Sequence, residues 1–138
     1  MFRVLVTTGL LGRASWLVAN GIEAAVGSVE RWADDPPPAV LTPGRPPFFY
    51  ALAGPPTVVA TVGATVLGPR RPAQVVSAVS TAAALGVTAT LVRTVVLPLR
   101  RGAVDRDAAV ARWYRRNRLR MLLEAVAVAA DVRVLVRP

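Results

Sequence analysis

The chain has 138 residues, a length that suits one domain and hardly two. It contains no Cys and no His, which excludes disulfides, thiolate metal sites and cysteine nucleophiles and removes the commonest general base and zinc ligand. We therefore expect neither a bound metal nor a cofactor. The formal net charge is +9, yet 54% of the residues are apolar and the mean hydropathy is +0.46, which is not typical of a soluble basic domain. All basic residues are Arg, and the abundance of Ala, Val, Gly and Pro beside them indicates a GC-rich coding sequence of actinobacterial type.

Four apolar segments follow one another, at about 4–26, 48–67, 73–97 and 118–135. Each is close to the ~20 residues that a helix needs to cross a bilayer. The second and third contain TVVATVGATVL and VVSAVSTAAALGVTATLV, which lack the polar face of a helix in a soluble bundle. Small and hydroxyl residues at this density suit helix packing in lipid. The sequence therefore predicts an all-α, single-domain (1–138), integral membrane bundle of four transmembrane helices.

The connections between the segments differ in length and charge. Prolines in 27–47 (DDPPP, PGRPP) forbid a continuous helix there, whereas 68–72 (GPRRP) is a tight turn. The stretch 98–117 is long, basic and partly helical from Asp105, with the carboxylates of Asp105 and Asp107 at the helix N-terminus. Arg residues are about twice as frequent on the side of the two long loops. The positive-inside rule then places 27–47 and 98–117 in the cytoplasm of a multi-pass cell-membrane protein.

Polar residues interrupt the first and last segments at helical spacing. Their presence, and the length of the first segment, favour a retained helix over a cleaved signal peptide. One stripe, under ~90° wide, comprises Arg13, Trp16, Asn20 and Glu23. The other, ~60° wide, comprises Trp113, Asn117, Arg120, Glu124 and Asp131. Charges inside crossing segments usually face the bundle interior, so we expect both stripes to point inward.

The two stripes match in depth if the first and last helices run antiparallel. At 1.5 Å per residue, Glu23 lies level with Arg120, Asn20 with Glu124, and Arg13 with Asp131. The charges are complementary in the first and third pairs. The sequence therefore predicts a polar seam between the first and last helices, with Arg13 and Asp131 as a structural ion pair.

Three roles for this seam stay open. The pairs fix the helix register and perform no chemistry; or they form a proton or ion path; or they form a substrate site that opens toward the long loops. The substrate site would comprise Asn20, Glu23, Trp113, Asn117, Arg120 and Glu124. In it, Glu124 is the candidate acid or base, and Arg120 and Asn117 would orient an anionic or carbonyl oxygen.

Two further features have alternative interpretations. Arg93, near the end of the third segment, is either an interfacial anchor whose side chain reaches the headgroups or a further cation of the same site. Thr57, Thr61 and Thr65 repeat every four residues, a spacing that favours helix packing over ligand binding.

The stretch RWYRRNRLR, residues 112–120, has the composition of a phosphate-binding helix. It runs directly into MLLEAVAVAA, so its arginines lie where anionic lipid headgroups are, with Trp113 and Tyr114 in the interfacial belt. The sequence has no Gly-rich phosphate loop and no RNA-binding aromatic pattern. We therefore expect a lipid bilayer with anionic headgroups as the partner, with a hydrophobic small molecule or a second copy of the chain as further candidates, and no nucleic acid.

The same stretch resembles a known family. Residues 112–120 are similar to the W-x-x-x-N-H-x-R segment of the anthrone-oxygenase-like family of small four-helix membrane proteins, and VVLPLR (95–100) is similar to its V-P-L-N segment. Here Arg118 replaces the family's His, and Arg100 replaces its Asn. The resemblance implies a four-helix membrane fold and places Trp113, Asn117 and Arg120 in the site.

Characterised relatives in that family oxidise anthrones to anthraquinones in polyketide pathways. The primary prediction is a small four-helix membrane protein with a polar seam between its first and last helices. The alternative is a membrane oxidoreductase that acts on a hydrophobic aromatic or polyketide substrate.

Overall fold

The computed structural model describes residues 1–35, 41–43, 46–69 and 71–137, and all the regular structure in these ranges is helical. The elements in chain order are α1 (Phe2–Ala25), α2 (Ser28–Asp34), α3 (Pro46–Leu67), α4 (Pro72–Leu91), the π-helix η1 (Val92–Val96), α5 (Leu97–Arg100) and α6 (Arg106–Val136). Since α4, η1 and α5 follow without a break, four long helical rods and the short α2 make up the fold.

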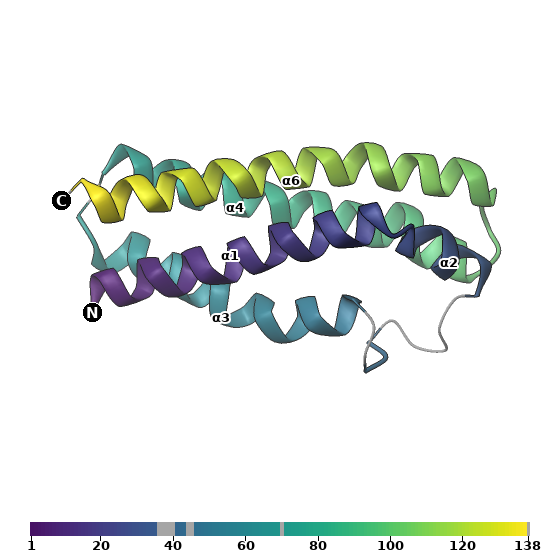
Figure 1. The fold of residues 1–138 in the computed structure, drawn as a ribbon, viewed down its shortest axis with the longest axis horizontal. Coiled ribbons are helices and arrows are strands. Elements are labelled where there is room, and N and C mark those ends of the chain that lie inside the picture. The colour runs from purple at the N-terminus through teal and green to yellow at the C-terminus, as the bar shows by residue number, and fades with distance from the viewer. Residues whose placement is uncertain (36–40, 44–45, 70, 138) are drawn as a thin grey trace.

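The four rods lie side by side as a bundle (Figure 1). Helix α1 packs against α3 and α6, and α4 packs against the same two neighbours. Both termini and the α3–α4 connection lie at one end, which we call the terminus end, and α2 lies at the other, the loop end. This arrangement places the inward faces of α1 and α6 against each other along most of their length.

Helix α6 joins two segments that the sequence analysis treated separately. The predicted helix from Asp105 is confirmed, and it continues without a break into the apolar segment predicted at 118–135, so only 101–105 connects α5 to α6. Asp105 caps the helix by accepting a hydrogen bond from the backbone N–H of Ala108 at 2.8 Å, and Asp107 lies in the first turn. No Gly or Pro follows before the end of the helix, and Arg is a good helix former, so nothing separates the basic segment from the apolar one.

The connection 27–47 also contains a helix that the proline pattern did not predict. Gly27 adopts a left-handed conformation (φ 62°), which a residue without Cβ tolerates, and this lets the chain turn from α1 into α2. The prolines of DDPPP, and part of PGRPP, lie in 36–40 and 44–45, outside the described residues. The predicted absence of a helix there therefore stays a prediction. In the tight turn 68–72, residue 70 lies outside the described residues as well.

The π-helix has a cause in the sequence. Pro98 has no N–H, so it cannot donate to the carbonyl of Thr94 four residues earlier, as a regular helix requires. Arg112 donates to this carbonyl through Nη1 at 3.4 Å, and Arg116 donates to the Thr94 hydroxyl at 2.5 Å. Two arginines of α6 thus satisfy the irregular turn and hold η1 against α6.

Helix α2 covers the loop end of α6. Val29 packs with Leu99 and Trp113 in a buried apolar cluster, and Tyr114 donates to Glu30 at 2.7 Å. Partial burial and this hydrogen bond raise the pKa of Tyr114 to about 12.

An exposed ion pair adds a contact between α2 and α6. Arg106 Nε lies 2.5 Å from Asp34 Oδ1. The hydrogen bond from Arg106 holds the pKa of the Asp34 carboxyl below its usual value.

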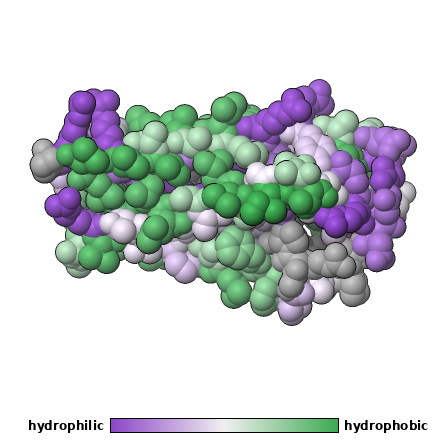
Figure 2. All heavy atoms as spheres, in the orientation of Figure 1, coloured by the Kyte–Doolittle hydropathy of each residue, from purple (hydrophilic) through white to green (hydrophobic). Residues whose placement is uncertain are grey.

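Compared with a soluble protein, the interior holds many polar residues beside its apolar core, and the surface holds many large apolar ones. The interior contains Arg13, Asn20, Asn117, Arg120, Glu124 and Asp131, each at most 7% exposed. Large apolar side chains such as Val18, Leu52 and Leu122 are more than 60% exposed. In Figure 2 apolar residues occupy the middle of the molecule, and hydrophilic ones gather toward its two ends.

By length and composition, two helices could cross a membrane: Phe48–Leu67 and Pro72–Arg100. Helices α1 and α6 contain more polar and charged residues, and several of these are buried within the bundle. The fold is therefore all-helical, with two candidate spans.

Candidate functional site

The buried polar residues form two clusters along the axis of the bundle. The terminus-side cluster comprises Arg13, Thr61, Ser77, Thr81 and Asp131. The loop-side cluster comprises Asn20, Glu23, Tyr50, Thr88, Asn117, Arg120 and Glu124. Both draw residues from all four rods.

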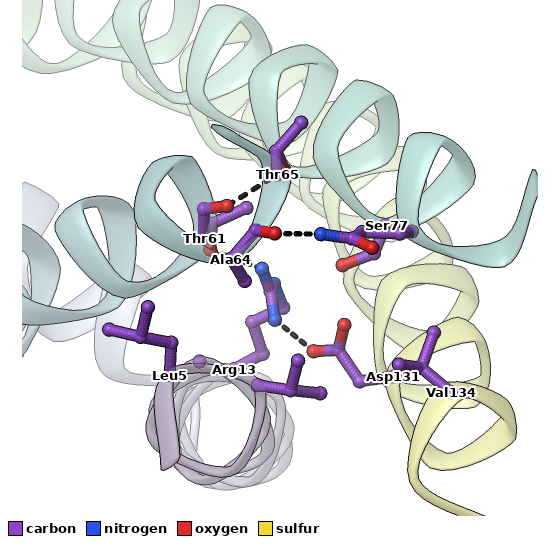
Figure 3. Close-up of a pocket in the computed structure, with 11 residues that line it drawn as sticks. Leu5, Arg13, Thr61, Ala64, Thr65, Ser77, Asp131 and Val134 are labelled. Atoms are coloured by element: carbon purple, nitrogen blue, oxygen red, sulfur yellow. Dashed lines mark hydrogen bonds and ion pairs between the residues drawn. The ribbon is translucent and has the colours of Figure 1, made fainter. Parts of the chain in front are cut away.

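Arg13 organises the terminus-side cluster. Its side chain is 2% exposed and extends from α1 toward α3, α4 and α6 (Figure 3). Nε donates to Thr81 of α4 at 2.8 Å, Nη2 donates to Thr61 of α3, and Nη1 pairs with Asp131 of α6. Each guanidinium nitrogen therefore reaches a different neighbouring helix.

The partners of Arg13 are themselves satisfied. Thr61 and Thr81 donate to the backbone carbonyls of Thr57 and Ser77, so their oxygens are free to accept from Arg13. Ser77 also hydrogen-bonds to the Asp131 carboxylate. The adjoining cavity is about 10 Å³, room for about one water molecule at most. The terminus-side cluster is thus a filled polar network.

The loop-side cluster is organised around Arg120. Nη2 donates to Asn20 Oδ1, Nη1 donates weakly to Thr88 at 3.5 Å, and Nε lies 3.8 Å from Glu124 Oε1. The Asn20 amide donates to Glu124 Oε2 at 3.3 Å. Asn20 and Glu124, which the depth argument placed level, are therefore linked directly and through Arg120.

Glu23 does not form the direct ion pair with Arg120 that the depth argument predicted. Its carboxylate accepts a hydrogen bond from Tyr50 at 3.0 Å, and the Tyr50 ring lies under the Arg120 guanidinium, 5.6 Å from its centroid. The aromatic side chain from α3 provides a cation–π contact and takes the position between the two charges. Arg120 instead points toward Asn20 and Glu124.

Several buried polar atoms have no hydrogen-bond partner among the described residues. Two belong to the loop-side cluster: Asn117 Oδ1 and Arg120 Nε. A third, Trp16 Nε1, lies one turn from Asn20 on the inward face of α1. Gln74 Oε1 lines the cavity beside the terminus-side cluster, and Trp32 Nε1 belongs to α2. Because buried polar groups in folded proteins are nearly always paired, the two unpaired atoms within the loop-side cluster need an explanation.

Two predicted residues lie apart from the polar clusters. Trp113 is buried, but it packs in the apolar cluster with Val29 and Leu99. Its burial agrees with the predicted inward stripe, but α2 covers its ring, so it lies apart from Arg120 and Glu124. Arg93 is exposed, so it is not a further cation of the buried site.

Sequence reasoning missed Tyr50, Ser77, Thr81 and Thr88 and assigned Thr61 to packing alone. On α4 a signal was present, because Ser77, Thr81 and Thr88 are spaced by four and seven residues and share one helix face. Tyr50 offered no such signal, since it is a single aromatic residue near the start of α3. Its role depends on how α3 packs against α1.

The described residues contain no group of three or more His, Cys, Asp or Glu side chains that could hold a metal ion. Comparison with protein-family models, with curated proteins and with solved structures found no match. The chemistry must therefore be argued from the two clusters themselves.

Proposed function

We propose that the chain is an integral membrane protein that crosses the bilayer four times. The observation that carries this proposal is the inverted polarity of α6. Between Arg118 and Arg133 its exposed residues are Leu119, Leu122, Ala125, Val126, Ala129 and Val132. This apolar band is about 22 Å long, and long Arg side chains at its ends extend the match to a ~30 Å hydrocarbon core.

The buried charges support four crossings rather than two. Arg13 of α1 bonds to α3, α4 and α6 at once, so a bilayer around α3 and α4 would also surround the other two helices. Ionisable residues within a membrane face the bundle interior and pair with one another, as Arg13 and Asp131 do. A soluble bundle would leave large apolar side chains in water along every helix.

We propose that the loop-side cluster binds the polar end of a hydrophobic small molecule. Arg120 Nε supplies a donor and Asn117 Oδ1 an acceptor, and both lack a hydrogen-bond partner among the described residues. A carbonyl or carboxylate oxygen would accept from Arg120, and a hydroxyl group would donate to Asn117. The apolar part of such a molecule would lie against the apolar side chains of the surrounding helices.

A membrane oxidoreductase is the second candidate. It is favoured by the burial of Asn117 and Arg120, two residues that the anthrone-oxygenase resemblance assigns to the site, on the same face of α6 as Glu124. In that reaction a methylene of the substrate is oxidised to a carbonyl: one atom of dioxygen becomes the carbonyl oxygen, and the other leaves as water with the two methylene hydrogens. Glu124, hydrogen-bonded to Asn20, would accept the proton that leaves the methylene carbon.

Cysteine labelling tests the four-span arrangement, because the native chain has no Cys and every introduced thiol is unique. With a membrane-impermeant maleimide, Pro69→Cys should label from the opposite side to Ala103→Cys, which we expect to be cytoplasmic. Ser15→Cys on α1 and Ala125→Cys on α6, both exposed in the bundle, should react only after the membrane is dissolved. Labelling of these two positions in intact membranes would show that only α3 and α4 cross.

Mass spectrometry of the protein purified in mild detergent tests the binding site. We expect a small hydrophobic molecule to be retained by the wild-type protein and lost from Asn117→Leu, which removes the acceptor without changing a charge. Arg118→Gln, an exposed neighbour, should keep the molecule. Equal retention in both variants would contradict a loop-side site.

The oxidoreductase is tested separately with an added anthrone. The wild-type protein should produce anthraquinone, detected by absorbance, and Glu124→Gln should abolish the product while the fold is kept. No product from a wild-type protein that still binds the anthrone would leave binding as the function.

A further inference from the structure

An open groove of about 830 Å³ lies at the terminus end, between the start of α4 and the end of α6. Its outer part is lined by Arg71, Arg133 and Arg137, and its inner part by Val76, Val126 and Ala129. From Val126 to Arg137 the groove follows α6 for about 16 Å. It is therefore basic at the end of the bundle and apolar toward the middle.

The arginines of this groove have few partners among the described residues. Arg71 donates through Nη1 to the backbone carbonyl of Arg137 at 2.8 Å, which leaves its other N–H groups available. Arg133 is exposed. The nearest acid on α6, Asp131, is buried and paired with Arg13, so it does not neutralise the groove.

The distribution of acids argues against a second copy of the chain as the occupant. Of the eight Asp and Glu residues, two are buried inside the bundle, Glu124 and Asp131. The other six belong to the loop end: Glu23, Glu30, Asp34, Asp35, Asp105 and Asp107. Two copies that met through this groove would bring arginines against arginines. An anionic partner fits the charge.

We propose that this groove holds one phospholipid with an anionic headgroup, from the leaflet at the terminus end. The phosphate lies among Arg71, Arg133 and Arg137, and one acyl chain follows the apolar wall past Ala129 to Val126. Basic pockets between transmembrane helices are known to bind anionic headgroups in this manner. The inference rests on the proposed membrane insertion.

Native mass spectrometry can test the proposal on the full-length protein in detergent, with equal amounts of phosphatidylglycerol and phosphatidylcholine added. We expect one phosphatidylglycerol to be retained in preference to phosphatidylcholine. Arg133→Gln should lower that preference by about fivefold, the effect of one cation near a headgroup. Arg3→Gln is the matched control, because Arg3 is exposed at the same end but lies outside the groove.

A second variant separates shape from charge. Ala129→Leu fills the inner groove without changing a charge, so it should reduce retention of both lipids, with the fold checked by circular dichroism. Equal retention of the two lipids by the wild-type protein, or equal effects of Arg133→Gln and Arg3→Gln, would overturn the proposal. A dimer that excludes lipid would overturn it too. If membrane insertion itself were wrong, cysteine labelling would already show Ala125→Cys reacting in intact membranes.

Discussion

The two buried clusters contain similar residue types but differ in how completely they are paired. In the terminus-side cluster one arginine meets one carboxylate, and hydroxyl groups from α3 and α4 take the remaining guanidinium nitrogens. In the loop-side cluster Arg120 lies beside Glu124, a second carboxyl group, Glu23, bonds to Tyr50 instead, and two polar atoms have no hydrogen-bond partner among the described residues. A complete network suits a structural role. An incomplete one with a surplus carboxyl group suits binding or proton transfer.

The largest expected effect comes from breaking the terminus-side pair. Arg13→Leu leaves Asp131 buried without its cation, and such a change typically costs about 3–5 kcal/mol. Removing both charges in Arg13→Leu/Asp131→Leu should recover most of the loss, because Thr61 and Thr81 keep their bonds to the backbone. Thermal unfolding in detergent measures all three proteins.

Exchanging the two charges tests the same pair, with assembly of the helical bundle as the measurement. Arg13→Asp should impair assembly of the bundle, and an added Asp131→Arg should restore it. If the double exchange is no better than either single change, Arg13 and Asp131 do not act as a pair.

Replacing a buried carboxylate by its neutral amide should destabilise the protein more in the terminus-side cluster than in the loop-side cluster. Asp131→Asn leaves the Arg13 charge without an anion and should cost several kcal/mol, whereas Glu124→Gln should cost about 1 kcal/mol or less. In the second case Arg120 stays near Glu23, and the amide oxygen can still accept from Asn20. Equal losses would show that the loop-side cluster is as structural as the other one.

A change at the contact between α1 and α3 should have a destabilising effect of intermediate size. A Cβ at Gly12 would collide with the Thr57 side chain, so Gly12→Ala should destabilise by about 1–3 kcal/mol through overpacking. Gly86→Ala is the control, since a Cβ there meets nothing within 4 Å and should stabilise α4 by up to about 1 kcal/mol. A neutral Gly12→Ala would mean that α1 and α3 are less closely packed.

The smallest expected effect is the pH dependence of the ion pair between Asp34 and Arg106 at the loop end. Because Arg106 lowers the pKa of Asp34 in the folded state, their contact stabilises the protein above the usual Asp pKa and is lost as the pH falls through the lowered value. The difference in thermal midpoint between wild type and Asp34→Asn should therefore shrink between pH 7 and pH 3. Asp35→Asn, at the exposed neighbouring position, should show no such trend. An exposed pair of this kind contributes little in either case.

Periodicity was enough to predict which polar residues of α1 and α6 point inward, because helical spacing fixes a side chain's direction. Equal depth placed Arg13 opposite Asp131 and Asn20 opposite Glu124, and the structure has both contacts. The predicted pair of Glu23 with Arg120 was wrong, because helix depth does not reveal that a third helix inserts Tyr50 between the two charges.

The fold, too, was predicted only in part from the sequence. The apolar segments were visible in the sequence. The helix from Asp105 was predicted, but its continuity with the apolar segment 118–135 was missed, although no Gly or Pro separates the two. The turn into α2 depends on Gly27 and on the apolar contacts of Val29, which no local pattern reveals.

The bonding of Arg13 also has a consequence for biosynthesis. If the chain crosses the bilayer as proposed, this arginine enters first during synthesis, and its carboxylate partner emerges 118 residues later. Until Asp131 arrives, the first helix is a poor substrate for insertion by itself, since a central arginine opposes transfer into lipid. Under the proposed four-span insertion, the first helix would therefore remain with the insertion machinery until the last one joins it.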